Sequence, residues 1–129
     1  MLADLLKKKE NLEKIRNVLK DFYDHVFLDT MIGFYFKDKN KTHLIEKEYE
    51  LTLNALGGTV SYTGRPLSSV HMPLKIAGGH FDRRLEILKN TLKAHDLPQE
   101  ISRSWIEHTI KLRSLITGDK PGECQQEGV

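Results

Sequence analysis

The stretch Leu12–Val26, LEKIRNVLKDFYDHV, decides the fold class. Its apolar side chains recur every three or four residues, at Leu12, Ile15, Leu19, Phe22 and Val26. This spacing aligns them along one side of an α-helix, whereas a half-buried strand would alternate strictly. The pattern extends back to Leu2 without Gly or Pro. Such a span is long for one helix, so we expect a bend or break within it.

Outward from this stretch, the rest of the chain also favours helices. Residues 29–40 contain Gly33 and three clustered aromatic residues, which predict a turn or a short helix. A second periodic segment, about 42–56, ends at a Gly-Gly pair, as helices commonly end. A break at Gly78-Gly79 precedes a third helix over about 80–94, and Pro98 suits the first turn of a fourth. Strand signals are absent, so we predict an all-α fold.

Length and composition narrow the class of protein. The chain has 129 residues, which favours one domain, and its formal net charge of +2 comes without a concentrated basic face. We therefore expect no nucleic-acid partner. No apolar run reaches the roughly 18 residues that a membrane span needs, and the N-terminus does not resemble a signal peptide. A single cysteine, Cys124, suits a reducing compartment, so we expect a cytoplasmic protein.

The end of the chain has a different composition. Residues 118–129 are polar, contain Gly and Pro, and offer almost nothing to bury. We expect them to form a disordered tail after a folded domain over residues 1–117.

Two charged residues, Glu48 and Arg84, stand where helical periodicity favours apolar side chains. Glu48 shares a stripe with Leu44 and Leu51, and Arg84 adjoins Leu85 in the stripe of the third helix. A lone buried charge is costly, whereas a paired one is tolerable. Either each side chain lies at the edge of its stripe and reaches water, or both line a polar cavity and face each other.

The chain has six histidines, and none has the HExxH spacing of a helical zinc site. His71 differs in context, because its short segment lies between Pro66 and Pro73. From spacing alone it could be a ligand or an ordinary surface residue. The neighbouring Ser68 and Ser69 lack the G-x-S-x-G elbow of a hydrolase.

Several short blocks, in their order and spacing, are similar to truncated hemoglobins: Asp21–Tyr23, Phe34–Phe36, Ala55–Gly58, Tyr62–Leu67, Val70–His71 and Phe81–Asp82. The likeness covers about residues 12–115, and its most specific block is 55–71. It implies a two-over-two helical sandwich around haem b, with His71 as the proximal ligand of the iron.

The same resemblance implies roles for the residues opposite His71. Phe36 matches the phenylalanine that packs against the porphyrin, and Tyr23 matches the tyrosine that hydrogen-bonds bound oxygen. Leu44, Lys47 and Glu48 fall on the distal helix. Lys47 matches a position that in relatives reaches a haem propionate or binds the iron itself, and the sequence leaves open which of these applies.

The chain departs from the family pattern in three places. Residues 7–11 replace the usual glycine pair near the N-terminus. Glu48 stands where glutamine or an apolar residue is common, and Arg84 stands where valine or tryptophan is common. We therefore hypothesise an ion pair between Glu48 and Arg84 in the distal pocket, beside Tyr23 and Leu44. A protonated Glu48 could instead donate a hydrogen bond or a proton.

Three functions remain open at this point. The first is a haem globin that binds O₂, CO or NO. The second is a haem enzyme served by a reductase, such as a nitric oxide dioxygenase or a peroxidase-like protein, because paired titratable groups near iron can move protons. The third is a haem-poor globin scaffold that acts through a protein partner.

Overall fold

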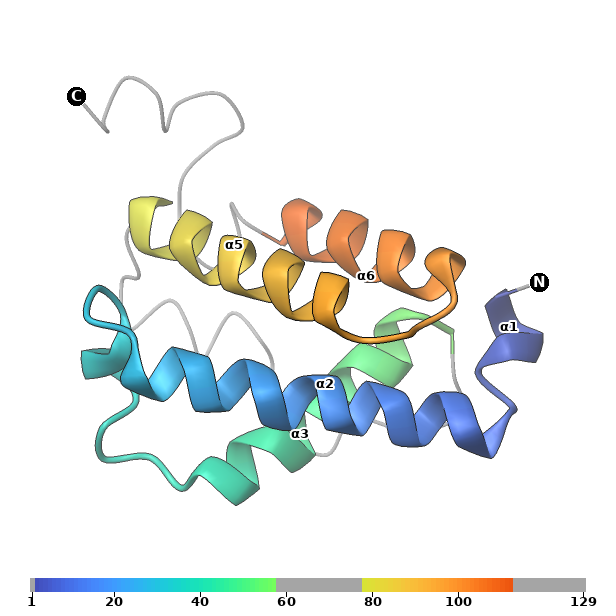
Figure 1. Ribbon diagram of the computed structural model, residues 1–129, viewed down its shortest axis with the longest axis horizontal. Coiled ribbons are helices and arrows are strands. Elements are labelled where there is room, and N and C mark those ends of the chain that lie inside the picture. The colour runs from blue at the N-terminus through green and yellow to red at the C-terminus, as the bar shows by residue number, and fades with distance from the viewer. Residues whose placement is uncertain (1, 58–77, 113–129) are drawn as a thin grey trace.

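The computed structural model describes residues 2–57 and 78–112 (Figure 1). Within these ranges the chain forms helices and contains no strand, which confirms the predicted all-α class. The elements are α1 (Leu2–Leu5), α2 (Lys9–Leu28), the 3₁₀ turn η1 (Gly33–Tyr35), α3 (Lys41–Ala55), α5 (Gly78–Ala94) and α6 (Gln99–Lys111). No helix in the described ranges has the length and apolar character needed to cross a membrane.

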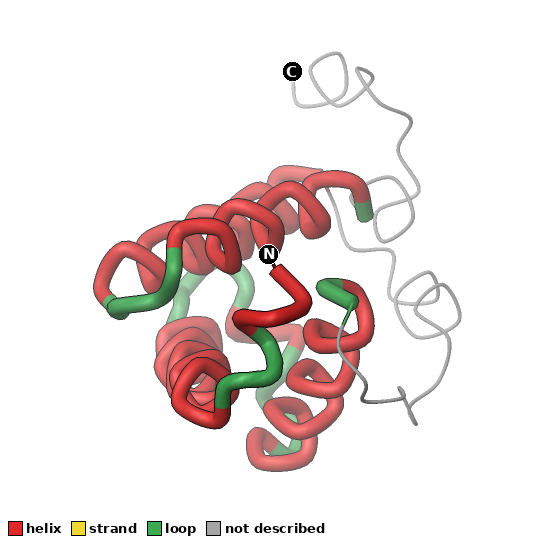
Figure 2. The backbone as a smooth tube through the Cα atoms, turned by 90° about the vertical axis from the view of Figure 1, so that its right-hand side faces the viewer, coloured by secondary structure: helices red, strands yellow, loops and turns green. Residues whose placement is uncertain are grey.

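The helices form two layers, each built from two helices. In Figure 1, α5 and α6 run above α2 and α3, and the end-on view in Figure 2 separates the two pairs. Helix α2 contacts both its layer partner α3 and the opposite helix α5, while α5 also contacts α6. Helix α2 therefore contacts a helix in each layer and positions α3 and α5 relative to each other.

The core lies where the two layers meet. Ile15, Leu19, Phe22 and Val26 of α2 are at most 1% exposed, which confirms the predicted stripe, and Leu12 is half-buried at its end. The opposite layer contributes buried apolar side chains from α5 and α6, among them Leu88, Leu92, Ile101 and Trp105. Burying each such side chain stabilises the fold by about 1.5–3 kcal/mol.

The long N-terminal span is broken, as predicted. Helix α1 ends at Leu5 and α2 begins at Lys9, with the exposed residues 7–9 around the break. Asn11 is buried, and its Nδ2 donates a hydrogen bond to the carbonyl oxygen of Leu5 at 2.9 Å. The same carbonyl accepts the backbone N–H of Lys8 at 3.3 Å, so Asn11 adds a second donor at the end of α1.

Asp29 organises the corner that follows α2. Its Oδ2 accepts hydrogen bonds from the backbone N–H groups of Met31 and Ile32, and its Oδ1 accepts two from the Arg83 guanidinium on α5. The turn then passes so close to α2 that a Cβ on Gly33 would lie 2.8 Å from the backbone oxygen of Phe27. Glycine is therefore required here, and the corner fixes where the aromatic residues after it lie.

The helix ends follow local chemistry. Asn40 caps α3 by accepting a hydrogen bond from the backbone N–H of His43 at 3.0 Å. Gly57, with a φ of +92°, ends α3 as predicted.

The starts of two helices were predicted wrongly. Helix α5 begins at Gly78 and not after the glycine pair, because the first turn of a helix tolerates glycine. Pro98 is the N-cap of α6 rather than part of its first turn.

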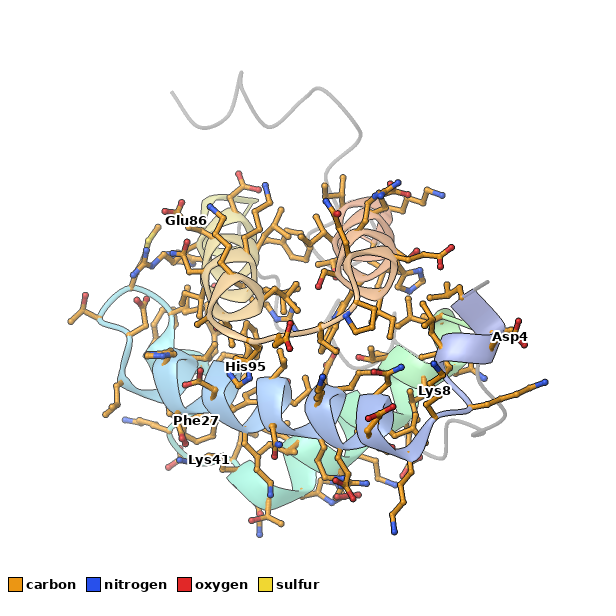
Figure 3. All side chains as sticks on the ribbon, turned by 45° about the vertical axis from the view of Figure 1, so that its right-hand side comes forward. Asp4, Lys8, Phe27, Lys41, Glu86 and His95 are labelled. Carbon is orange, nitrogen blue, oxygen red and sulfur yellow. The ribbon has the colours of Figure 1, made fainter. Side chains whose placement is uncertain are left out.

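A histidine that follows the C-terminal end of α5 forms a hydrogen bond with α2. His95 Nε2 donates to Asp21 Oδ2 at 2.9 Å, and Figure 3 shows His95 reaching from the end of α5 towards α2. His25, one turn along α2, lies 3.2 Å from the other oxygen of Asp21. Together with Arg83 and Asp29, these contacts tie the two layers at both ends of α5.

Candidate functional site

Three polar side chains from three helices meet beside the core. Tyr23 of α2 donates its hydroxyl to Glu48 Oε1 on α3 at 3.4 Å. Arg84 Nη2 on α5 lies 3.5 Å from the same carboxylate oxygen. Tyr23 is 4% exposed, and the side chains of Glu48 and Arg84 are 20% and 18% exposed. The two charged residues singled out by the periodicity therefore face each other across the layers.

Two adjacent residues of α2 contribute to this cluster. Phe22 and Tyr23 are adjacent and both buried, with their rings edge-on at 5.1 Å. The Arg84 guanidinium lies 4.9 Å from the centre of the Phe22 ring. An aromatic face attracts a cation within about 6 Å, so Phe22 helps to hold Arg84 towards Glu48.

Burial and charge shift the proton affinities in the cluster. Burial raises the pKa of Tyr23 well above its ordinary value, and the Glu48 carboxylate raises it further. Burial acts to lower the pKa of Arg84, but the nearby Glu48 and Tyr23 outweigh it, so that the pKa of Arg84 is raised. At neutral pH, Tyr23 therefore keeps its proton and Arg84 keeps its charge.

A fourth titratable group, His108, lies on α6. Burial and the nearby Lys111 together lower the pKa of His108, while Glu48 acts in the opposite direction. Each of the other three helices of the two layers thus contributes a titratable group, Tyr23, Arg84 or His108, that interacts with Glu48.

Aromatic and aliphatic side chains border the cluster. The Phe36 ring lies edge-on to Tyr23 with centroids 6.2 Å apart, and it lies 5.8 Å from Phe27. At the outer edge of these rings, Lys41 Nζ approaches the Phe27 ring at 5.4 Å (Figure 3). Leu44 of α3 packs against the core but stays half-buried. The site thus combines an apolar wall with hydrogen-bond donors.

The structure places most of the predicted site residues, though not all. Tyr23, Glu48 and Arg84 come together, and Phe36 adjoins them. Lys47 lies on α3, and its Nζ is 3.8 Å from Glu50 Oε2 on the same helix. His71, together with the rest of the segment 58–77, lies outside the described residues.

Sequence reasoning missed one contact close to the site. Tyr35 Oη and His80 Nδ1 lie 2.8 Å apart, although 45 positions separate the two residues. Neither residue interrupts a pattern in its own segment. Only the packing of η1 against the first turn of α5 brings them together, so no local signal could have found this pair.

The comparisons with known proteins agree with this arrangement. The family model described as "Bacterial-like globin" matches residues 10–117. A group 1 truncated hemoglobin of Tetrahymena thermophila is 31% identical over 93 residues, which cover 70% of this chain and 77% of that protein.

Solved structures share the fold at lower identity. Truncated hemoglobin from Tetrahymena pyriformis, in its Fe(III) form, is 20% identical, with a TM-score of 0.78 over 92% of this chain and 98% of that one. Its solved variants include one with a tyrosine changed to phenylalanine and two with a glutamine changed to glutamate. The 2/2 hemoglobin from Synechococcus sp. PCC 7002, in the cyanomet state with covalently attached heme, is 20% identical, with a TM-score of 0.79 over 89% and 98%.

Two layers of two helices, with a tyrosine and a polar cluster between them, define a globin of the two-over-two kind. The extent of the family match and the identity to the Tetrahymena thermophila protein make the assignment specific. The chain belongs to the truncated hemoglobin family, whose globins bind haem and diatomic gases.

Proposed function

We propose that this protein binds haem b with His71 as the proximal ligand of the iron, and that it binds a diatomic gas, O₂, CO or NO, on the opposite side. The gas pocket is formed by Tyr23, Leu44, Glu48 and Arg84. The observation that carries the proposal is the meeting of Tyr23, Glu48 and Arg84 at one point, in a chain of a gas-binding family.

The spacing of these residues supports the assignment of the pocket. In the Tetrahymena pyriformis protein, a tyrosine and two glutamines were chosen for substitution. The numbers of residues that separate these three positions equal those that separate Tyr23, Leu44 and Glu48. Equal spacing is what a correspondence without a gap between α2 and α3 would give, and on that correspondence Glu48 takes the place of a glutamine.

The described residues fit a haem by their chemistry. Leu44, Glu48 and Leu51 form one stripe along α3, and all three side chains are half-buried. Two of the three, Leu44 and Leu51, are apolar and so offer an apolar surface to a ligand. The half-buried Phe36 adds an aromatic surface next to it. Pockets for large ligands are mostly apolar with a few placed polar groups, and this stripe has that composition. When bound, haem supplies an iron atom with an open coordination site for the gas.

Glu48 gives the pocket its particular character. A tyrosine hydroxyl has one hydrogen to donate, and here Glu48 accepts it. A bound gas therefore competes with Glu48 for the Tyr23 hydrogen. Arg84 changes the balance in two ways, because it neutralises Glu48 and carries further N–H donors of its own. We expect the affinity for O₂ to depend on both charges.

A second candidate function is a haem enzyme, and the contact between Glu48 and Arg84 favours it. A carboxylate that accepts the Tyr23 hydrogen can move a proton, and an adjacent guanidinium can stabilise developing negative charge. Peroxidase-like chemistry uses such groups, and both this chemistry and nitric oxide dioxygenation need a reductase or another electron donor.

Carbon monoxide is the sharpest probe of this pocket. In the haem-loaded protein, infrared spectroscopy should find a C–O stretching frequency that rises in Tyr23→Phe, because a hydrogen-bond donor is lost. Glu48→Gln should shift it as well, because a charge is lost. Glu46→Gln is the matched control, since Glu46 is exposed on α3 and pairs with Arg16. Equal frequencies in all four proteins would contradict the proposed pocket.

A further inference from the structure

Tyr35 and His80 form a contact that gas binding does not explain. Tyr35 belongs to η1 and His80 to the first turn of α5, and both are half-buried. Tyr35 Oη lies 2.8 Å from His80 Nδ1, and the two ring centroids are 5.5 Å apart. When His80 carries its hydrogen on Nε2, its Nδ1 accepts the hydroxyl hydrogen of Tyr35. The tyrosine thus has a base positioned on its proton.

Aromatic rings continue from Tyr35 in two directions. Outward, Phe34 stacks on Tyr35 with centroids 4.1 Å apart, and Phe34 is 58% exposed. Inward, Phe36 lies 6.4 Å from Tyr35 and 6.2 Å from Tyr23. One unbroken series of rings therefore leads from the surface to the buried Tyr23.

Both tyrosines in this series have a proton acceptor. Tyr35 has His80, and Tyr23 has Glu48 at 3.4 Å. A phenol that loses an electron becomes a strong acid, so its oxidation is eased when a base takes the proton in the same step. Tyr49 provides a comparison, because the group 4.0 Å above its ring is the Arg16 guanidinium, which is not a base.

We propose that Tyr35 and His80 form a redox-active pair that passes electrons from soluble one-electron donors at the Phe34 surface to Tyr23 across Phe36. The donors that fit an exposed aromatic ring are small phenols and related aromatic reductants. The inner end of the route rests on the proposed function, since the oxidising equivalent would come from a hydroperoxide that reacts at the haem. The redox activity of the pair itself does not depend on haem.

The steps balance in protons and electrons. Tyr23 loses one electron to the oxidant and its proton to Glu48, and becomes a tyrosyl radical. Tyr35 then gives one electron to Tyr23 across Phe36 and its proton to His80, while Glu48 returns the first proton to Tyr23. The phenolic donor finally gives one electron to the Tyr35 radical and its own proton to water, and His80 returns the second proton to Tyr35. Two such turns supply the two electrons, and the solvent supplies the two protons, that reduce one hydroperoxide to an alcohol and water.

Flash photolysis tests the pair without haem. The full chain, shown by circular dichroism to be folded, is mixed with tris(bipyridine)ruthenium(II) and a sacrificial acceptor, and the flash generates the ruthenium(III) oxidant. We expect a tyrosyl radical absorbance whose rise slows in D₂O. Tyr35→Phe should remove most of this signal, whereas the control Tyr49→Phe should keep it. His80→Gln keeps a polar side chain but no base, and should slow the rise about a hundredfold.

The outcomes separate a redox role from a purely structural one. The exposed His43 on α3 provides a matched control, and His43→Gln should leave the rate unchanged. A wild-type rate in His80→Gln, or an unchanged radical yield in Tyr35→Phe, would overturn the proposal. Where one of these variants fails to fold, the other decides, by the radical yield in Tyr35→Phe or by the rate in His80→Gln.

A second measurement distinguishes failure of this route from failure of the proposed function. The haem-loaded protein is treated with hydrogen peroxide and frozen for electron paramagnetic resonance. We expect a tyrosyl signal that Tyr35→Phe weakens and that a phenol quenches more slowly in that variant. Haem binding without any tyrosyl signal would overturn the route and leave gas binding intact. Failure to take up haem would refute the proposed function, while the ruthenium result would still decide the redox pair.

Discussion

The Glu48 carboxylate and the Arg84 guanidinium lie 3.5 Å apart, on helices from opposite layers of the fold. Each side chain interrupts the apolar stripe of its own helix, and each is about four-fifths buried. Their contact explains how the fold tolerates both charges, because a buried charge is acceptable only when it is paired. The same contact gives the first prediction.

Arg84→Met should lower the free energy of unfolding by about 1–2 kcal/mol, less than for a fully buried pair because water reaches one side. The loss arises mostly from the unpaired Glu48, so the double variant Glu48→Gln and Arg84→Met should recover part of it. Urea unfolding measures these values. Arg16→Met, which breaks the exposed pair with Glu46, is the control and should cost less than about 1 kcal/mol. Equal losses in both single variants would contradict the role of burial.

The ionisation of Tyr23 should respond to Glu48. Burial and the Glu48 charge both raise the pKa of Tyr23, while Arg84 lowers it. Glu48→Gln removes one raising influence and keeps the lowering one, so the pKa of Tyr23 should fall towards its ordinary value of 10.0. Ultraviolet titration of tyrosinate, with Tyr23→Phe to assign the signal, measures this shift. A pKa that stays equal to that of the wild type would show that Glu48 and Tyr23 do not interact.

The contact between Asp29 and Arg83 should make the free energy of unfolding depend on pH in the acid range. Hydrogen bonds from Arg83 lower the pKa of Asp29 in the folded state below its ordinary 3.8, with help from the backbone N–H groups of Ile32 and Met31. A lowered carboxyl pKa stabilises the fold above the ordinary pKa, and this contribution is lost as pH falls through the folded-state value.

Asp29→Asn removes that contribution while it keeps an acceptor for the turn. At neutral pH the variant should be less stable than the wild type by at most about 1 kcal/mol, because the partly exposed Arg83 loses its charged partner. As pH falls below 3.8 the difference should shrink, and it should vanish once the pH lies below the lowered folded-state pKa of Asp29. Unfolding curves at several pH values provide the measurement, and a constant difference at every pH would be inconsistent with the Asp29 contact.

Two glycines offer a matched pair of substitutions. Gly33→Ala places a Cβ 2.8 Å from the backbone oxygen of Phe27, so the turn must shift at a cost of about 1–3 kcal/mol. Gly79→Ala meets nothing within 4 Å in the first turn of α5, and should stabilise the protein by about 0.4–1 kcal/mol. Thermal unfolding compares them. The same sign for both substitutions would contradict the described corner.

Much of the fold could be predicted from periodicity. The stripe around Ile15 and Phe22 indicated a buried helix, and Gly57 indicated where α3 ends. Glu48 and Arg84 became visible because each broke such a stripe. Periodicity predicts which side of a helix is buried. A charged residue within an apolar stripe indicates a position where a buried charge must have a partner.

The contacts between distant segments could not be predicted in the same way. Tyr35 with His80, and Asp29 with Arg83, depend on how η1 and the corner before it dock on α5. Neither contact changes a local pattern. The start of α5 at Gly78 was also predicted wrongly, because two glycines favour a break in isolation, and the chain continues the helix through them.

The most direct test of the account is hemin titration of the purified protein, followed by reduction with dithionite and addition of carbon monoxide. We predict uptake of one haem per chain with a Soret band that shifts with carbon monoxide, loss of this behaviour in His71→Ala, and its retention in His43→Ala. Haem uptake that survives in His71→Ala would refute the proximal assignment. No stoichiometric uptake by the wild-type protein would contradict haem binding itself and favour a globin scaffold that acts through a protein partner.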